Sequence, residues 1–298
     1  MEFVRTPDER FEKLPDYPFA AKYLQLKDGM RMHFLDEGPS NGPIVLLLHG
    51  EPSWSFLYRK MIPPLVEAGF RAVAPDLIGF GKSDKPTRTS DYSFEKHLDW
   101  LGQCLDHLDL KDIHLFCQDW GGLLGLRLAT AQTERFSTIT AANTFLPTGS
   151  AKPNKAFLQW RSFSQTIPEF PVGNVLQMAT STDLSPEVVA AYEAPFPDES
   201  YKAGARIFPA LVPIEADDPE AQNNKEAWKV LQQWKKPFLT LFSDSDPIMK
   251  GLEKYFIEQI PGAKGQPHKM IEGAAHFLQE DKGEELAKHL IRFLKQDL

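Results

Sequence analysis

The sequence predicts an α/β protein with a mostly parallel, doubly wound sheet and an inserted helical cap. Apolar runs typical of strands alternate with helical patterns through residues 44–142 and again through residues 237–296. Between these stretches, residues 147–234 show no strand pattern and are rich in Pro, Phe and Trp. We therefore assign residues 1–146 and 235–298 to one α/β core and residues 147–234 to the cap. A length of 298 residues suits one domain with an insertion.

Short apolar runs indicate the strands of the core. The run Ile-Val-Leu-Leu-Leu at residues 44–48 is continuous, which is typical of a parallel strand buried on both faces. A Lys-Asp-Gly turn at residues 27–29 predicts a hairpin between strands at 21–26 and 30–36. Further strands are expected at 70–74, 113–116, 137–142, 237–242 and 268–271, and helices at 55–68, 94–108, 123–129, 248–259 and 284–296.

Composition argues against several classes of function. The net charge of −8 disfavours nucleic acid or an anionic membrane as the main partner. The first residues carry no secretory signal and no apolar run is long enough to cross a membrane, so we expect a cytoplasmic protein. Cys104 lies in a helical pattern and Cys117 at a tight turn, so no disulfide is expected. No histidine pair has metal-ligand spacing, so we expect no metal and no other cofactor. The expected state is a monomer.

The segment Cys-Gln-Asp-Trp-Gly-Gly at residues 117–122 lies between a strand pattern and a helix pattern. Strand, tight turn and helix form the setting of a nucleophile elbow, which needs small residues two positions either side of the nucleophile. Cys117 and Gly121 meet this need around Asp119. Because an aspartate with a pKa near ~4 is ionised at neutral pH, Asp119 can attack an sp3 carbon and form an ester. The alternative role is a helix N-cap, which Asp favours.

An ester on Asp119 needs a base that activates water, and His276 is the candidate. It follows Gly-Ala-Ala at residues 273–275, whose small side chains let a ring approach the elbow. Two acids, Asp244 and Asp246, follow the first core strand after the cap, and one of them can hold the histidine in its working tautomer. We favour Asp246, with Asp244 as the alternative. The chain order then matches the nucleophile, acid and base order of hydrolases with this elbow.

The segment His-Gly-Glu-Pro at residues 49–52 directly follows the strand at 44–48. Glycine permits a sharp exit from a strand, so the next backbone N–H can point into a site. In hydrolases with an elbow, such an N–H and that of the residue after the nucleophile bind the oxyanion. These donors would be the N–H groups of Glu51 and Trp120. The alternative is an ordinary strand-to-helix turn.

A tryptophan next to the nucleophile suggests a site for a leaving anion. The indole N–H of Trp120 is a donor with no acceptor role, so it suits a halide ion. Two converging donors hold an anion better than one, and Trp160 in the cap is the best second candidate. On composition alone, packing of the cap against the core is the favoured explanation of Trp160. An apolar pocket is expected to be lined by Phe157, Phe208, Pro209 and Val212.

With these residues in place, the sequence resembles the haloalkane dehalogenases of the α/β-hydrolase fold over nearly its full length. The similar segments are residues 49–63, 74–76, 79–86 and 118–122 of the core and residues 194–197 and 208–209 of the cap. Glu51 and Asp246 match the branch of the family that binds halide through two tryptophans. The resemblance therefore implies that Trp160, three residues after Phe157, is the second halide ligand beside Trp120.

The resemblance implies that a haloalkane and water react through an aspartyl ester to give alcohol, halide and a proton, with no cofactor. The nearest alternative is an epoxide hydrolase, which needs acidic donors such as the cap residues Tyr192 and Tyr201. That family's aromatic residue after His-Gly is missing, since Glu51 stands there. A fluoroacetate dehalogenase normally carries arginine where this chain has Trp120. A silent binding protein of the same fold tends to lose a member of the triad, and here all three are present.

Overall fold

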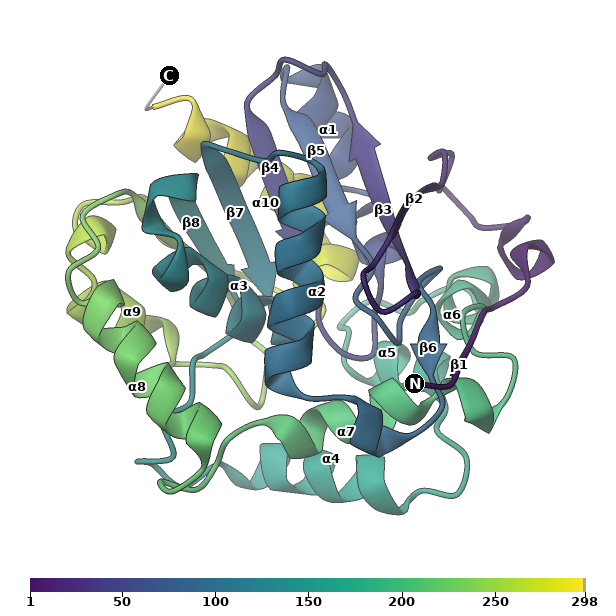
Figure 1. The fold of residues 1–298 in the computed structure, drawn as a ribbon. Helices are drawn as coiled ribbons and strands as arrows, with labels where there is room; N and C mark the ends of the chain where they lie inside the picture. Colours follow the sequence, from purple (N-terminus) through teal and green to yellow (C-terminus); the bar gives the residue numbers. More distant parts are fainter. Residues whose placement is uncertain (297–298) are drawn as a thin grey trace.

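The computed structural model describes residues 1–296 and contains an eight-stranded sheet flanked by helices on both faces (Figure 1). The strand order is β10-β9-β8-β7-β4-β5-β3-β2, parallel from β10 to β5 and antiparallel at β3 and β2, which confirms the predicted mostly parallel sheet. A separate ribbon pairs β1 (Phe3–Val4) with β6 (Lys85–Pro86). The strands of the main sheet are β2 (Lys22–Gln25), β3 (Arg31–Glu37), β4 (Ile44–Leu48), β5 (Arg71–Pro75), β7 (Ile113–Gln118), β8 (Phe136–Ala142), β9 (Phe238–Ser243) and β10 (Lys269–Ile271).

The register of the parallel strands brings four loops to one edge of the sheet. Leu48 at the end of β4 pairs with Cys117 of β7, so the loop after β4 and the turn after β7 lie next to each other. Ser243 at the end of β9 pairs with Ile271 at the end of β10. The loops that carry the predicted acid and histidine therefore leave the sheet at the same edge, where ligands of doubly wound sheets bind.

Helices cover both faces of the sheet. On one face α1 (Ile62–Glu67) packs against α10 (Leu278–Leu294), and on the other α2 (Phe94–His107) packs against α3 (Trp120–Ala131) (Figure 1). The remaining core helix, α9 (Glu253–Gln259), packs against β9.

Three helices begin five to seven residues away from their predicted starts. The helix expected at 55–68 is a 3-10 turn at Ser55–Tyr58 followed by α1, because Pro63 and Pro64 belong in the first turn of a new helix. The helix expected at 248–259 begins only at Glu253, after Gly251, whose φ of 91° no α-helix contains. The last helix begins at Leu278 and is kinked at Lys282, which has φ −140°.

Between β8 and β9 the described chain forms five α-helices, a short 3-10 helix at Glu199–Tyr201 and no strand. They are α4 (Lys155–Thr166), α5 (Val172–Met178), α6 (Pro186–Glu193), α7 (Ala203–Leu211) and α8 (Pro219–Leu231). Helix α4 packs against α7 and α5 against α6, whereas α8 packs against α3 of the core. All five lie within the predicted cap, whose boundaries at 147 and 234 stay a prediction. Within residues 1–296 no helix is long and apolar enough to cross a membrane, and no three His, Cys, Asp or Glu side chains form a group able to hold a metal.

Candidate active site

Asp119 occupies a strained turn between β7 and α3. Its φ of 51° and ψ of −126° place it in a region that non-glycine residues seldom adopt. The turn also demands glycine nearby, since a Cβ on Gly121 would lie 2.1 Å from the carbonyl oxygen of Leu48. The Asp119 side chain forms no capping hydrogen bond to α3, so the N-cap role is wrong. This conformation is that of a nucleophile elbow.

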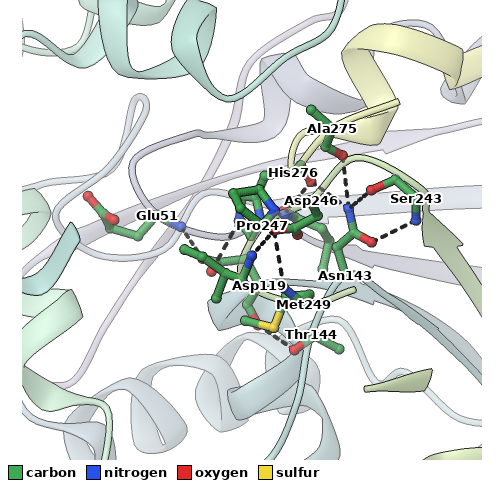
Figure 2. Close-up of polar contacts among 12 residues, drawn as sticks. Glu51, Asp119, Asn143, Thr144, Ser243, Asp246, Pro247, Met249, Ala275 and His276 are labelled. Carbon is green, nitrogen blue, oxygen red and sulfur yellow. Dashed lines mark hydrogen bonds and ion pairs between the residues drawn. The ribbon is translucent and has the colours of Figure 1, made fainter. Parts of the chain in front are cut away.

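The two carboxylate oxygens of Asp119 have different partners (Figure 2). Oδ1 accepts a 2.8 Å hydrogen bond from the backbone N–H of Glu51, and Oδ2 lies 3.4 Å from Nε2 of His276. A Cβ on Gly50 would lie 2.2 Å from Oδ1, so only glycine lets this loop approach. Trp120 is the first residue of α3, where a backbone N–H has no acceptor within the helix. The Glu51 and Trp120 N–H groups can therefore serve as an oxyanion hole.

His276 is held on its other side by Asp246. Nδ1 of His276 lies 2.7 Å from Oδ2 of Asp246, while Oδ1 of Asp246 accepts hydrogen bonds from the N–H groups of Ile248 at 2.8 Å and Met249 at 3.1 Å. Asp246 is fully buried. Burial raises the pKa of its carboxyl, but the His276 imidazole and these two N–H groups outweigh burial and lower it. Asp244 instead accepts from the Gly273 N–H at 3.1 Å and does not contact His276.

The charges around His276 favour its protonated form in the free protein. Burial acts against the cation, but the Asp246 and Asp119 carboxylates outweigh burial and raise the pKa of His276 to about 10. The pKa of the Glu51 carboxyl is also raised, well above its usual value, by burial and then by the charge of Asp119. For a carboxyl group a raised pKa favours the neutral form, whereas for histidine it favours the charged form. These surroundings favour the neutral form of Glu51, whereas the Asp119 carboxylate faces His276.

Two amide side chains that the sequence did not single out support the histidine. Asn143, which follows β8, donates through Nδ2 to Ser243 Oγ at 2.7 Å and to the carbonyl oxygens of Ala275 at 2.9 Å and His276 at 3.1 Å. The backbone carbonyl of Asn143 accepts a hydrogen bond from the Asp119 N–H at 3.2 Å, so Asn143 links the elbow to the histidine (Figure 2). Gln118 also donates to the His276 carbonyl, at 3.2 Å. The sequence signal that could have identified both residues is their position: Gln118 ends β7 and Asn143 directly follows β8, where residues of a ligand site are expected.

A cavity of about 700 Å³ lies above these residues and is bounded by the cap. Its predominantly apolar lining includes the predicted residues Phe157, Pro209 and Val212 together with Asp119, Trp120, Trp160 and His276. The expectation for Phe208 is not met. Phe208 does not line the cavity; it is fully buried and packs on the far side of Trp120, with 4.6 Å between ring centroids.

Trp120 and Trp160 differ from the other four tryptophans because they line the cavity. Trp100 donates to Asp28 and Trp228 to the Leu146 carbonyl, both outside the cavity. Trp120 and Trp160 line the cavity, and within residues 1–296 no protein atom accepts a hydrogen bond from either indole. These two donors are therefore available to an anion in the cavity.

Comparison with known proteins decides the family. A family model described as the alpha/beta hydrolase fold matches residues 43–283. The sequence is 54% identical to a haloalkane dehalogenase of Psychrobacter cryohalolentis, over 99% of this chain and 98% of the relative. It is 51% identical to a haloalkane dehalogenase of Mycolicibacterium paratuberculosis, over 98% of each. The chain belongs to the haloalkane dehalogenases.

A solved relative supports both family and fold. The tetrameric haloalkane dehalogenase DpaA of Paraglaciecola agarilytica superposes with a TM-score of 0.90 at 39% identity, covering 97% of both chains. The predicted family, fold and reaction class are thus confirmed: the chain is a hydrolase that acts on carbon–halide bonds. The tetramer is a property of DpaA, and the monomer expected here stays a prediction.

The epoxide-hydrolase alternative is not favoured by these relatives or by the site. Tyr192 is fully buried and donates its O–H to Glu280, and neither Tyr192 nor Tyr201 lines the cavity. Neither tyrosine is therefore placed to donate to an epoxide oxygen.

Proposed function

We propose that this dehalogenase works through an ester on Asp119, with His276 as the base, Asp246 as its acid and Trp120 and Trp160 as the halide ligands. One observation carries the proposal. The Asp119 carboxylate has one oxygen on the Glu51 N–H and the other facing the His276 imidazole, inside an apolar cavity. That arrangement separates the attacking oxygen from the oxygen that later needs oxyanion stabilisation.

In the first step Asp119 is alkylated. Oδ1 is occupied by the Glu51 N–H, so Oδ2 attacks the carbon that bears the halogen. The new C–O bond forms as the carbon–halogen bond breaks, and the electron pair of that bond leaves with the halide. The indole N–H groups of Trp120 and Trp160 stabilise the departing anion. Because the cavity is largely apolar, these hydrogen bonds compete with little water.

In the second step the ester is hydrolysed. Alkylation removes the charge of Asp119, which is one of the two carboxylates that raise the pKa of His276. The imidazole then releases its proton more readily and becomes able to take one from water. The resulting hydroxide attacks the ester carbonyl, and the N–H groups of Glu51 and Trp120 bind the oxyanion. The C–O bond between the carbonyl carbon and the alcohol oxygen breaks, and the alcohol oxygen takes the proton that His276 removed from water. The acid left on Asp119 loses its proton, which restores the carboxylate.

The His276→Phe variant tests this division of labour. We expect it to release one halide per active site from 1,2-dibromoethane and then stop, because alkylation needs no base. Intact-protein mass spectrometry should find the ester on the peptide that contains Asp119. His107→Phe, which replaces an exposed histidine at the end of α2, is the matched control and should turn over normally. Sustained turnover by His276→Phe would refute the assigned role.

A further inference from the structure

The carboxylate of Asp281, near the start of α10, joins the cap to the loop that carries the catalytic histidine. We define the histidine loop as residues 272–277 and the cap loop as residues 179–185, between α5 and α6. Oδ1 of Asp281 accepts from the N–H groups of Ser181 at 3.0 Å and Thr182 at 2.8 Å in the cap loop. Oδ2 accepts from the Ala275 N–H at 2.8 Å in the histidine loop. Ala275 is the residue before His276.

We call these contacts of Asp281 the junction, and neighbouring residues add further contacts between the cap and the segment that carries His276. The Phe277 N–H donates to the carbonyl of Ala179 at 3.1 Å, which joins the two loops directly. Glu280, the residue before Asp281, accepts from the Tyr192 O–H of helix α6 and from the Arg59 guanidinium of the core. The α5 and α6 part of the cap is therefore fixed to the segment that carries His276.

The part of the cap that carries Trp160 is attached elsewhere. Asn154, which caps the start of α4, donates through Nδ2 to the carbonyl of Ile248 at 2.9 Å. Trp160 lies on this helix, with its indole at the cavity. The attachment of α4 thus reaches the loop that carries Asp246, whereas that of Asp281 reaches the loop that carries His276.

We propose that Asp281 is a positioning residue that couples the seated cap to His276 and so controls the hydrolysis of the ester. The inference rests on the proposed function, in which His276 is needed only after alkylation. Displacing a base by about 1 Å costs up to roughly a hundredfold in rate. Asp281 has no contact with Asp119 or with the halide ligands, so its loss should spare the alkylation step.

The test separates the two half-reactions in rapid-quench experiments with 1-bromobutane. We expect Asp281→Ala to keep a full burst of one bromide per site at a rate within about twofold of the unmodified enzyme, and to hydrolyse the ester about tenfold more slowly. The butyl ester should accumulate during turnover, as seen by intact-protein mass. Asp281→Asn, which can still accept through its amide oxygen, should give an intermediate hydrolysis rate.

Two control variants each remove one contact near the junction and leave all contacts of Asp281 in place. Tyr192→Phe loosens helix α6 without touching the histidine loop, and Asp244→Ala removes the bond to Gly273 in the histidine loop without touching the cap. We expect each to slow hydrolysis less than Asp281→Ala does. The proposal is overturned if Asp281→Ala slows both half-reactions equally, leaves both unchanged, or matches Tyr192→Phe. A His276→Phe enzyme that fails to stop after one halide would instead overturn the proposed function on which this inference rests.

Discussion

The two walls of the cavity are built in different ways. The core wall contributes Asp119, Asp246 and His276, and each of these side chains is held by polar contacts of 2.7–3.4 Å. The cap wall contributes mainly apolar side chains such as Phe157 and Val212, which have no hydrogen-bonding group. We therefore expect the core wall to carry the nucleophile and the base, and the cap wall to select substrates by shape and to contribute one halide donor through Trp160.

The difference extends to the backbone. On the core wall a positive φ at Asp119 and close approaches at Gly50 and Gly121 leave room for no other arrangement. Such strained positions persist only where the surrounding structure determines them fully. On the cap wall Trp160 and Val175 line the cavity from within helices, but much of the lining comes from loops and helix ends, which adapt more easily to substitution. Substitutions in the core wall should therefore change the rate by orders of magnitude, and those in the cap wall by smaller factors.

The largest effect is expected for Asp119→Asn in the core wall. The amide cannot attack carbon, so turnover of 1,2-dibromoethane should fall by roughly 10⁴-fold or more. The Asn side chain is also uncharged, so one cause of the raised pKa of His276 is removed. The pKa of His276 should fall below the value of about 10 in the free enzyme.

An NMR titration of the His276 imidazole in both proteins measures this pKa. The protonation of His276 also determines how hydrolysis depends on pH. Because the neutral imidazole is the base, the rate of ester hydrolysis should rise with pH until the pKa of His276 in the ester is passed. An unchanged pKa in Asp119→Asn would show that Asp119 does not contribute to the charge of the histidine.

The division between the walls also explains what the sequence could and could not predict. The elbow follows from local rules, because small residues around Asp119 and the chain order of Asp246 and His276 are visible without a structure. Asn143 was missed because its role depends on β8 lying next to both β7 and β9, which spacing alone does not give. Positions within the cap depend on how its helices end and pack, and a sequence pattern does not contain that information.

A moderate effect is expected for Trp160→Phe, the cap's proposed contribution to halide binding. The substitution keeps an aromatic ring and removes the N–H, so bromide should bind roughly tenfold more weakly, as for the loss of one hydrogen bond to a charged group. Isothermal titration calorimetry with bromide measures the change. Trp228→Phe is the matched control, since that indole donates to the Leu146 carbonyl away from the cavity. Equal bromide affinity in Trp160→Phe and the parent protein would remove Trp160 from the halide site.

The smallest effect is expected from the two cap residues that the sequence grouped together and the structure separates. Phe208 and Val212 would share one helix face if α7 continued, but α7 ends at Leu211 and Val212 is extended, with ψ 120°. Val212 consequently turns toward the cavity, while Phe208 packs behind Trp120. Val212→Phe should lower kcat/KM for 1-bromohexane relative to bromoethane by about threefold, less than one methylene costs in a tight pocket, with little change in Tm.

Phe208→Leu should do the reverse. Loss of packing behind Trp120 should lower the free energy of unfolding by about 1–2 kcal/mol and leave the preference for chain length unchanged. Denaturant unfolding and competition between the two bromoalkanes measure both quantities in each variant. If Phe208→Leu altered chain-length preference as strongly as Val212→Phe, the cap wall would be set by packing behind Trp120 as much as by the residues that line it. The contrast between a fixed core wall and an adaptable cap wall would then not hold at Trp120, a core residue that packs against Phe208 of the cap.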